Sequence, residues 1–287
     1  MHSKLLFSIL TVFIFASAPL CRAAEDDTVL LNTLGYTTGQ SILLTHMAVG
    51  TLADAYVGKA YKSEQATTFI TTYLNITKGM KDQMKKLLDD LGVRCYSTHN
   101  SSSYFTAENL RKARDMNLIL GSKYVVMSSS DPKPGLDGWK EVADTLNSAA
   151  DQLESSGLKT GYHNHQREFT PVEGKRPIEI LAKNTKPSVM LQFDIGTCLE
   201  AGSDPVAWIR ANPGRIRSMH CKDWAPGADK GYTVLFGEGS ADWKNIFAAA
   251  ESVGGIEYYL IEQEGSRFSE FDTAKKCLQT FRNLRPA

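Results

Sequence analysis

The sequence predicts an α/β protein, a single (β/α)8 barrel of the TIM barrel type that follows a cleaved signal peptide. Short β-rich runs end near positions 98, 127, 163, 194, 220 and 262, with apolar helical stretches between them. Gaps of about thirty residues match one strand–helix unit, repeated along the chain. The alternative is an open doubly wound sheet, which usually carries a glycine-rich phosphate loop after its first strand. The chain has no GxGxxG or GxxxxGK motif, so we favour the barrel.

Eight strands close such a barrel, and six of them are predicted from these runs. The runs are 93–98, 124–127, the residues leading to 163, 189–194, 216–221 and 258–262. Upstream, Ile42 to Met47 and Thr67 to Leu74 are the candidates for the remaining two. No Pro/Gly/Ser-rich linker interrupts the chain, so we expect one domain over residues 24–287.

The helices between the strands carry end signals that can be read from the sequence. Thr106 is a candidate N-cap for a helix that ends before Gly121. Asp204 followed by Pro205 is a second capping pattern, because proline fits the first position of a helix. Ser269 is the expected cap of the last helix. The apolar stripes that define the helices span 80–91, 139–153, 178–181, 243–250 and 271–281.

The first 23 residues resemble a secretory signal peptide. Lys4 precedes an apolar run, residues 5–18, that is too short for a comfortable membrane span. Ala23 ends a usable cleavage site, and an uncleaved anchor is the alternative. We therefore expect a secreted or periplasmic protein that has no membrane association after signal cleavage.

Charge and cysteine content exclude several classes of protein. Lys and Arg number 32 and Asp and Glu also number 32, so no basic surface for nucleic acid is expected. After the signal, the cysteines are Cys95, Cys198, Cys221 and Cys277. None of them forms a close pair, so we expect buried free thiols and no zinc ribbon or redox dithiol.

Polar residues follow the predicted strands at the points where each one ends. They are His99, then His163, Asn164 and His165, then Asp194, then His220, Lys222 and Asp223, and finally Glu262 and Glu264. In a (β/α) barrel the active site lies at these carboxyl ends. Imidazoles and carboxylates that converge from several strands favour one divalent metal ion, Mn²⁺, Zn²⁺, Co²⁺ or Fe²⁺.

Simpler roles remain open for each residue taken alone. A single strand-end histidine is more often a hydrogen-bonded core residue than a ligand. Asp194 has the alternative role of capping the turn that follows it. Glu262 has the alternative role of pairing with Lys222 without binding a metal. The concurrence of these residues at one end of the barrel favours the metal site.

Seven motifs together resemble the xylose isomerase-like barrel superfamily, the sugar phosphate isomerase/epimerase group, over Met80 to Phe281. The motifs are Tyr162-His163-Asn164-His165 with Glu168-Phe169, Phe193-Asp194-Ile195-Gly196, Ala201-Gly202-Ser203-Asp204-Pro205, Gly214-Arg215-Ile216, His220-Cys221-Lys222-Asp223, Gly237-Glu238-Gly239 before Asp242-Trp243, and Leu260-Ile261-Glu262-Gln263. Each motif alone is weak, and their order and spacing make the set specific.

The resemblance implies one divalent metal held by Glu, Asp, His and Glu from four strands. Asp194, His220 and Glu262 match the last three of these ligands. His163 stands where the family has its first Glu, and His165 on the same strand face is an alternative ligand. The two metal-bound glutamates form the acid/base pair of the family's epimerases, so this difference argues against that mechanism. Thr197 is a second departure, where many members have an aromatic residue or His.

The resemblance also implies enolisation of a hydroxy-carbonyl sugar on the metal. Glu262 or His165 is the candidate base, and Lys222 is placed to stabilise an oxyanion. His99 is expected to contact a substrate hydroxyl or a metal-bound water. The substrate-binding candidates are Glu168, which would orient His163 or His165, and Trp243, which would form a platform under a sugar ring or lie in the core.

These residues predict a metal-dependent isomerase or epimerase that acts on a small-molecule sugar. Because phosphorylated sugars are cytoplasmic metabolites, export favours an unphosphorylated substrate. A lyase or dehydratase on a keto-sugar or an oxidised glycoside is the first alternative, and a non-catalytic sugar-binding barrel is the second. An endonuclease-like barrel is disfavoured, because it needs three metals and a basic groove.

Overall fold

The centre of the molecule is a seven-stranded sheet, described here from a computed structural model. The structure describes residues 14–17, 85, 86, 89 and 94–285. The strands are β1 (Ile14–Ser17), β2 (Ser97–Ser101), β3 (Tyr124–Ser129), β4 (Lys159–His163), β5 (Met190–Asp194), β6 (Ile216–Cys221) and β7 (Tyr258–Ile261). Strands β2 to β7 pair in parallel with their neighbours in chain order. Six strands are therefore confirmed, but β2 begins at Ser97 and not at the predicted position 93, so that His99 lies within the strand.

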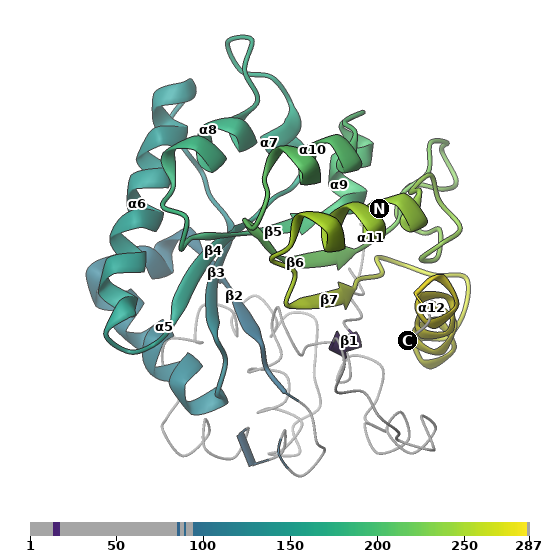
Figure 1. The fold of residues 1–287 in the computed structure, drawn as a ribbon, viewed down its shortest axis with the longest axis horizontal. Helices are drawn as coiled ribbons and strands as arrows, with labels where there is room; N and C mark the ends of the chain where they lie inside the picture. The colour runs from purple at the N-terminus through teal and green to yellow at the C-terminus, as the bar shows by residue number, and fades with distance from the viewer. Residues whose placement is uncertain (1–13, 18–84, 87–88, 90–93, 286–287) are drawn as a thin grey trace, which may run out of the picture.

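Helices lie along the outside of this sheet (Figure 1). They are α5 (Ala107–Leu120), α6 (Leu136–Glu154), α7 (Gln166–Phe169), α8 (Pro177–Asn184), α9 (Ile195–Glu200), α10 (Pro205–Ala211), α11 (Trp243–Val253) and α12 (Glu270–Leu284), with a 3-10 turn, η2, at Ser102–Phe105. Each of α5, α6, α8, α10 and α11 lies in a connection between two consecutive parallel strands. This strand–helix alternation is the parallel half of a TIM barrel.

The predicted helix ends are confirmed by their hydrogen bonds. The Thr106 hydroxyl accepts from the backbone N–H of Asn109, and Gly121 ends α5 at a φ of 70°. This left-handed conformation costs glycine little, so the residue stops the helix without strain. The Asp204 carboxylate accepts from two backbone N–H groups at the start of α10, and Ser269 caps α12.

The sheet separates two apolar layers. Side chains of successive strand residues point to opposite faces, so Val125 and Met127 pack under the helices while Val126 points to the inner face. The inner layer is small, comprising Tyr124, Val126, Met190, Tyr258 and Leu260, with Tyr96 beside it. It lies below the strand ends, where the apolar layer gives way to buried polar side chains.

The strand β1 lies inside the predicted signal peptide. It pairs antiparallel with β7, Ile14 opposite Ile261 and Ser17 opposite Tyr258. The remaining signal residues, the two upstream strand candidates and most of the helix predicted at 80–91 lie outside the described residues.

The four cysteines after the signal are buried and free, as the sequence predicts. Burial raises the pKa of the Cys277 thiol to about 11, which keeps it protonated at neutral pH. None of the helices in the described part of the chain is both long and apolar enough to cross a membrane.

Candidate active site

Strand register brings the predicted site residues to one face of the sheet. His99 of β2 lies opposite Val126, His163 of β4 opposite Gln192, and Asp194 of β5 opposite His220. Because partners in a parallel pair share a face, these side chains point into the barrel. Glu262 follows β7 directly and joins the same end of the sheet. The structure thus brings together all four predicted metal ligands and His99.

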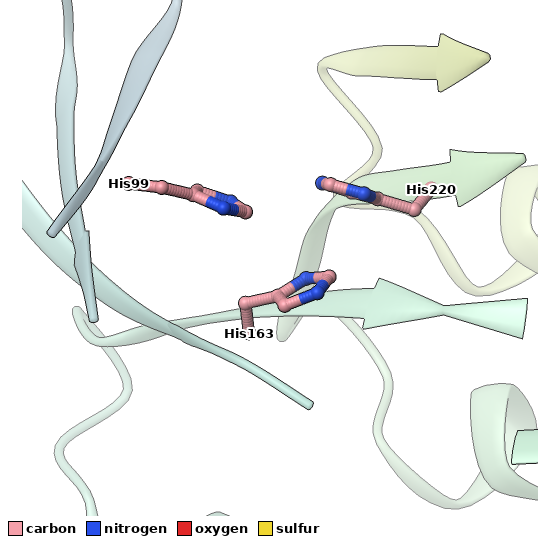
Figure 2. A group of neighbouring side chains, drawn as sticks. All are labelled: His99, His163 and His220. Carbon is pink, nitrogen blue, oxygen red and sulfur yellow. The ribbon is translucent and has the colours of Figure 1, made fainter. Parts of the chain in front are cut away.

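Three imidazoles from three strands face one another (Figure 2). The ring centres of His99 and His163 are 4.8 Å apart, those of His163 and His220 are 4.4 Å apart, and those of His99 and His220 are 5.4 Å apart. Burial lowers the pKa of His220 to about 3 and that of His99 well below its usual value. Neutral imidazoles carry the lone pair that a metal ion needs.

Two groups of side chains in the described part of the chain have ligand atoms close enough to hold one metal ion. The first is His99, His163 and His220, and the second is Asp194, His220 and Glu262. Within each group all the ligand atoms lie within 4.8 Å of one another. His220 belongs to both groups. Nitrogen and oxygen donors of this kind fit a divalent transition metal better than Ca²⁺, so the residues present fit the predicted cofactor.

Lys222 neutralises the carboxylates of the site. Its Nζ lies 3.0 Å from Asp194 Oδ2, 3.3 Å from Glu262 Oε1 and 3.0 Å from Glu264 Oε1, and the residue is 3% exposed. Burial alone would lower the pKa of Lys222, but the three carboxylates outweigh it and hold the pKa well above its usual value. Lys222 is therefore a proton-bearing hydrogen-bond donor at neutral pH.

Asp194 has both of the roles that the sequence left open. Its Oδ1 accepts from the backbone N–H of Thr197 at 2.8 Å and so caps α9, while Oδ2 faces Lys222. Asn164 holds this turn in place, because its side chain accepts from the Asp194 N–H and donates to the Thr197 hydroxyl. Thr197, a departure from the family pattern, thus serves the turn that carries Asp194.

His163 and His165 are separated by the structure. His163 is the last residue of β4 and is 1% exposed. His165 is the N-cap of α7, and its half-buried ring lies 4.9 Å from that of His163 in an edge-to-face contact. His165 belongs to neither candidate metal group among the described residues. Of the two predicted candidates for the first ligand, only His163 therefore lies in a candidate ligand group.

Glu168 and Trp243, the predicted substrate-binding residues, are both buried and engaged by other side chains of the protein. The buried Glu168 carboxylate accepts from the Tyr162 hydroxyl at 2.8 Å and from the His165 backbone N–H at 2.7 Å. Glu168 thus orients the backbone of His165. The sequence had predicted that Glu168 would orient the side chain of His163 or His165. Trp243 is 3% exposed, and its ring centre is 4.5 Å from that of Phe236. Core packing, the alternative for Trp243, is the role that the structure shows.

Asp223 organises the segment that follows β6. Its two carboxylate oxygens accept five hydrogen bonds, from the backbone N–H groups of Trp224, Gly237, Gly239 and Ala241 and from the Trp243 indole. A Cβ on Gly239 would lie 2.1 Å from Asp223 Oδ1, so only glycine fits there. The segment carries Tyr232, whose ring centre lies 4.9 Å from Lys222 Nζ. Sequence reasoning noted the position of Asp223 but missed this role and Tyr232.

Gln192 is a further site residue that the sequence analysis missed. It is fully buried on β5, and its Oε1 is hydrogen-bonded to His99 Nε2 while its Nε2 donates to Ser218 Oγ at 3.1 Å. Gln192 precedes Asp194 by two positions, so strand alternation places both side chains on the inner face. A polar residue two positions before a predicted strand-end ligand was the signal available in the sequence.

The fold and the site together define a TIM barrel with an imidazole- and carboxylate-rich centre at the carboxyl ends of its strands. Over residues 61–284 the chain matches the family described as xylose isomerase-like TIM barrel. The chain belongs to this family, and the predicted resemblance is confirmed. The family includes enzymes, among them isomerases, epimerases and dehydratases.

Curated relatives include several proteins named inosose dehydratase. The one from Geobacillus thermodenitrificans is 25% identical over 210 residues, which cover 62% of this chain and 70% of the relative. The one from Clostridium beijerinckii is 29% identical over 142 residues, covering 44% of this chain and 47% of the relative. The chain therefore spans about half the length of this second relative.

Solved structures show the same fold. A sugar phosphate isomerase/epimerase from Parabacteroides distasonis is 29% identical with a TM-score of 0.61, covering 72% of this chain and 76% of that one. The IolI protein, solved with a zinc atom, is 14% identical with a TM-score of 0.57, covering 84% and 96%. At 14% identity, the similarity to the IolI protein shows a shared fold and nothing more.

Proposed function

We propose that this protein is a metal-dependent lyase that enolises a hydroxy-carbonyl sugar and then eliminates water or an alcohol from it. The observation that carries this proposal is the buried, protonated Lys222 beside Glu262 and His220. A proton donor, a carboxylate base and imidazole ligands thus share one end of the barrel. The family includes enzymes that act on sugar-like molecules, which supports the substrate class.

The proposed cofactor is one divalent ion, Mn²⁺, Zn²⁺, Co²⁺ or Fe²⁺, bound through His220 and its neighbours. When bound, such an ion polarises a carbonyl oxygen as a Lewis acid and so acidifies the adjacent C–H bond. His220 is common to both candidate ligand groups, so either arrangement puts the ion beside Lys222 and Glu262.

The protein's own residues supply the proton transfers. Glu262 accepts the proton from the carbon next to the carbonyl, and its position is held by contacts to His220 Nδ1 and Lys222 Nζ. Lys222 donates a hydrogen bond to the substrate oxygen that gains negative charge as this proton leaves. Its raised pKa keeps the proton on Nζ throughout.

Elimination fits this set of residues better than epimerisation. Epimerisation in the family's manner needs a second carboxylate on the opposite face of the sugar, and His163 occupies that position here. Elimination needs one base and one acid. The C–H proton goes to Glu262, the C–O bond at the next carbon breaks, and the leaving oxygen takes a proton from His165. The products are an alkene conjugated to the carbonyl and one water or alcohol.

Isomerisation or epimerisation of the same substrate is the second candidate function. Both reactions begin with the same proton abstraction, and they end with the return of a proton instead of elimination. The 29% identical structure from Parabacteroides distasonis, named as an isomerase/epimerase, is the observation that favours this alternative.

We further propose that the protein is secreted or periplasmic and that its sugar is unphosphorylated. The basis is the apolar run that follows Lys4, with Ala23 at the cleavage site. An exported enzyme meets free keto-sugars and oxidised glycosides more readily than phosphorylated metabolites. The zero formal charge favours such a small-molecule partner over nucleic acid.

The function is tested by incubating the metal-loaded protein with a panel of keto-sugars and oxidised glycosides in D₂O. We expect deuterium exchange at the carbon next to the carbonyl, together with a product lighter by one water or one alcohol. Products of unchanged composition would favour isomerisation. Turnover of phosphorylated sugars alone would overturn the proposed substrate, and absence of both exchange and turnover would overturn the function.

Glu262→Gln and Lys222→Met provide the variants for this assay. We expect Glu262→Gln to abolish exchange because the base is lost, with a decrease of at least about 100-fold. Glu251→Gln, a substitution at a surface carboxylate on α11, is the matched control and should retain wild-type exchange. Wild-type exchange rates in Glu262→Gln would reject Glu262 as the base.

A further inference from the structure

We propose that Tyr232 is the platform on which the sugar lies, and that the substrate is therefore bound as a closed pyranose ring and not as an open chain. This inference rests on the proposed function in taking a hydroxy-carbonyl sugar as the substrate, and it adds the form in which that sugar binds. The sequence offered Trp243 as the platform, but Trp243 is 3% exposed and packs against Phe236. Tyr232 lies on the connection between β6 and α11 and is half-buried, so a ligand can reach part of its side chain.

The backbone of Tyr232 is fastened to the turn that follows β7. Gln263 Nε2 donates to the carbonyl oxygens of Tyr232 and Val234, both at 2.9 Å, and to that of Gly265 at 3.0 Å. Gln263 is 2% exposed and comes directly after Glu262 in the chain. A buried side chain held by several hydrogen bonds is rigid. The position of Tyr232 relative to Glu262 is therefore set by the protein and does not depend on a bound metal ion.

The ring of Tyr232 is held from two sides. Its hydroxyl donates to Glu200 Oε2 at 2.5 Å, and Glu200 is the last residue of α9, the helix that begins directly after Asp194. The ring also lies close to Gly196, where a Cβ would come within 3.1 Å of Tyr232 Cε1. A side chain at position 196 would crowd the ring, so the glycine lets Tyr232 approach the turn that carries Asp194.

Tyr232 thus lies beside the strand ends that carry the site. Asp194 ends β5, Lys222 directly follows β6 and Glu262 directly follows β7. The contacts with Gly196 and Gln263 join Tyr232 to the first and the last of these strand ends, and its ring centre is 4.9 Å from Lys222 Nζ. The platform is therefore next to the residues that are proposed to move the proton.

The chemistry of this platform favours a closed sugar ring. The face of an aromatic ring carries partial negative charge, so it attracts C–H groups that lie across it. A pyranose presents several C–H groups on one face, whereas an open-chain sugar has no such face and loses more rotational freedom on binding. Glu200 and Glu264 are half-buried carboxylates beside Tyr232 and Lys222, and both can accept from sugar hydroxyls. The arrangement fits a keto-sugar or an oxidised glycoside in the pyranose form.

The test compares a closed-ring and an open-chain substrate in the metal-loaded wild type and in Tyr232→Ala. The probes are a methyl keto-glucopyranoside, whose ring is locked by the glycosidic bond, and erythrulose, a ketose too short to form a pyranose. We expect Tyr232→Ala to raise KM for the keto-glucopyranoside by about tenfold and to change kcat by less than about threefold, because a platform binds substrate and transition state alike. For erythrulose, kcat/KM should change by less than about threefold.

Tyr232→Phe and Phe268→Ala are the controls for this test. Phenylalanine keeps the aromatic face and loses the bond to Glu200, so KM for the keto-glucopyranoside should stay within about threefold of wild type. Phe268→Ala removes an exposed ring that lies against Lys276 of α12, and it should retain the wild-type KM. An equal fall in kcat/KM for both substrates in Tyr232→Ala would show that the residue only supports the fold, and this result or an unchanged KM would overturn the inference.

Binding of an unreactive sugar separates this inference from the proposed function if neither substrate is converted. Methyl β-D-glucopyranoside has no carbonyl, so its affinity, measured by titration calorimetry, does not depend on turnover. An affinity about tenfold weaker in Tyr232→Ala than in Phe268→Ala would leave the platform intact while the function is rejected. Equal affinities in the two variants, or no binding by the wild type, would reject both.

Discussion

At the scale of single residues, charge balance in the site depends on Lys222. One ammonium faces Asp194, Glu262 and Glu264, and the first two of these carboxylates are at most 4% exposed. Burial raises the pKa of Asp194, which shows that its charge is costly in this environment. The ammonium offsets this cost, so the site needs Lys222 for stability as well as for catalysis.

We predict that Lys222→Met destabilises the protein by about 3–5 kcal/mol, because it leaves buried carboxylates without their cation. Urea unfolding at pH 7 measures this change. Lys230→Met, at an exposed position on the same segment, is the control and should change the free energy of unfolding by less than about 0.5 kcal/mol. Equal stability of the two variants would show that Lys222 does not neutralise the site.

The buried imidazoles predict a pH dependence for the metal-free protein. The folded-state pKa of His220 is about 3 and that of His99 is also lowered, whereas both are near 6.5 when unfolded. Between these values the unfolded chain binds more protons, so stability is present above pH 6.5 and is lost as the pH falls toward 3. The raised pKa of Asp194 acts in the opposite direction, because a carboxyl that binds its proton more readily in the folded state favours folding at low pH.

Lowering the pH from 7 to 5 should therefore cost the metal-free protein about 2 kcal/mol of unfolding free energy through His220, at about 1.4 kcal/mol per pH unit below 6.5, and His99 adds to this loss. Urea unfolding at the two pH values measures this loss. The double variant His99→Gln/His220→Gln should lose most of the dependence. An unchanged dependence in that variant would assign it to other groups.

At the scale of elements, the segment between β6 and α11 is organised by one carboxylate. Asp223 accepts four backbone N–H groups and the Trp243 indole, and Tyr232 on the same segment lies against Lys222. The Tyr232 hydroxyl donates to Glu200 Oε2 at 2.5 Å, which ties the segment to α9. The segment is thus fixed at both Asp223 and Tyr232.

We predict that Asp223→Ala costs at least about 3 kcal/mol, because several buried N–H groups lose their acceptor together. Thermal and urea unfolding measure the change, and turnover should fall as Tyr232 loses its position. Asp229→Ala, an exposed substitution on the same segment, should be neutral within about 0.5 kcal/mol. A small effect of Asp223→Ala would mean that water replaces the lost acceptor.

Local signals allowed most helix and strand ends to be predicted from sequence. Thr106, Asp204 and Ser269 cap the helices they were predicted to cap, because capping depends on backbone N–H groups two or three residues away. The role of Trp243 could not be predicted in the same way. Its burial depends on Phe236, which reaches it only after the segment folds back over Asp223.

At the scale of the whole molecule, six parallel strands in chain order place the site at one end of the barrel. The edge of β7 away from β6 pairs with β1, a strand within the predicted signal peptide. Signal cleavage would remove β1, but β7 would keep its parallel pairing with β6 from Ser218 to Cys221. The described half of the barrel therefore keeps its parallel strand pairing when β1 is absent.

We predict that the chain expressed in an exporting host begins at Ala24, and intact mass measures this directly. The mature protein should unfold within about 3 °C of an unprocessed chain purified from the cytoplasm, since four β1 residues contribute about 1 kcal/mol or less. A chain that retains residues 1–23 after export would contradict cleavage. A fall of more than about 10 °C would show that β1 is an integral strand.

The sequence by itself determined the order of strands and helices, the end of the barrel that carries the site and the residue types that gather there. These follow from periodicity, capping and alternation, which act over a few residues. The tertiary structure decided which residues meet. His163 and His165 have the same alternation along the chain, but β4 ends at His163 and α7 begins after His165, so only His163 joins a candidate ligand group while the His165 ring lies beside it. The contacts of His99 with Gln192 and of Lys222 with three carboxylates join strands that are distant in sequence, and only the register of the folded sheet sets them.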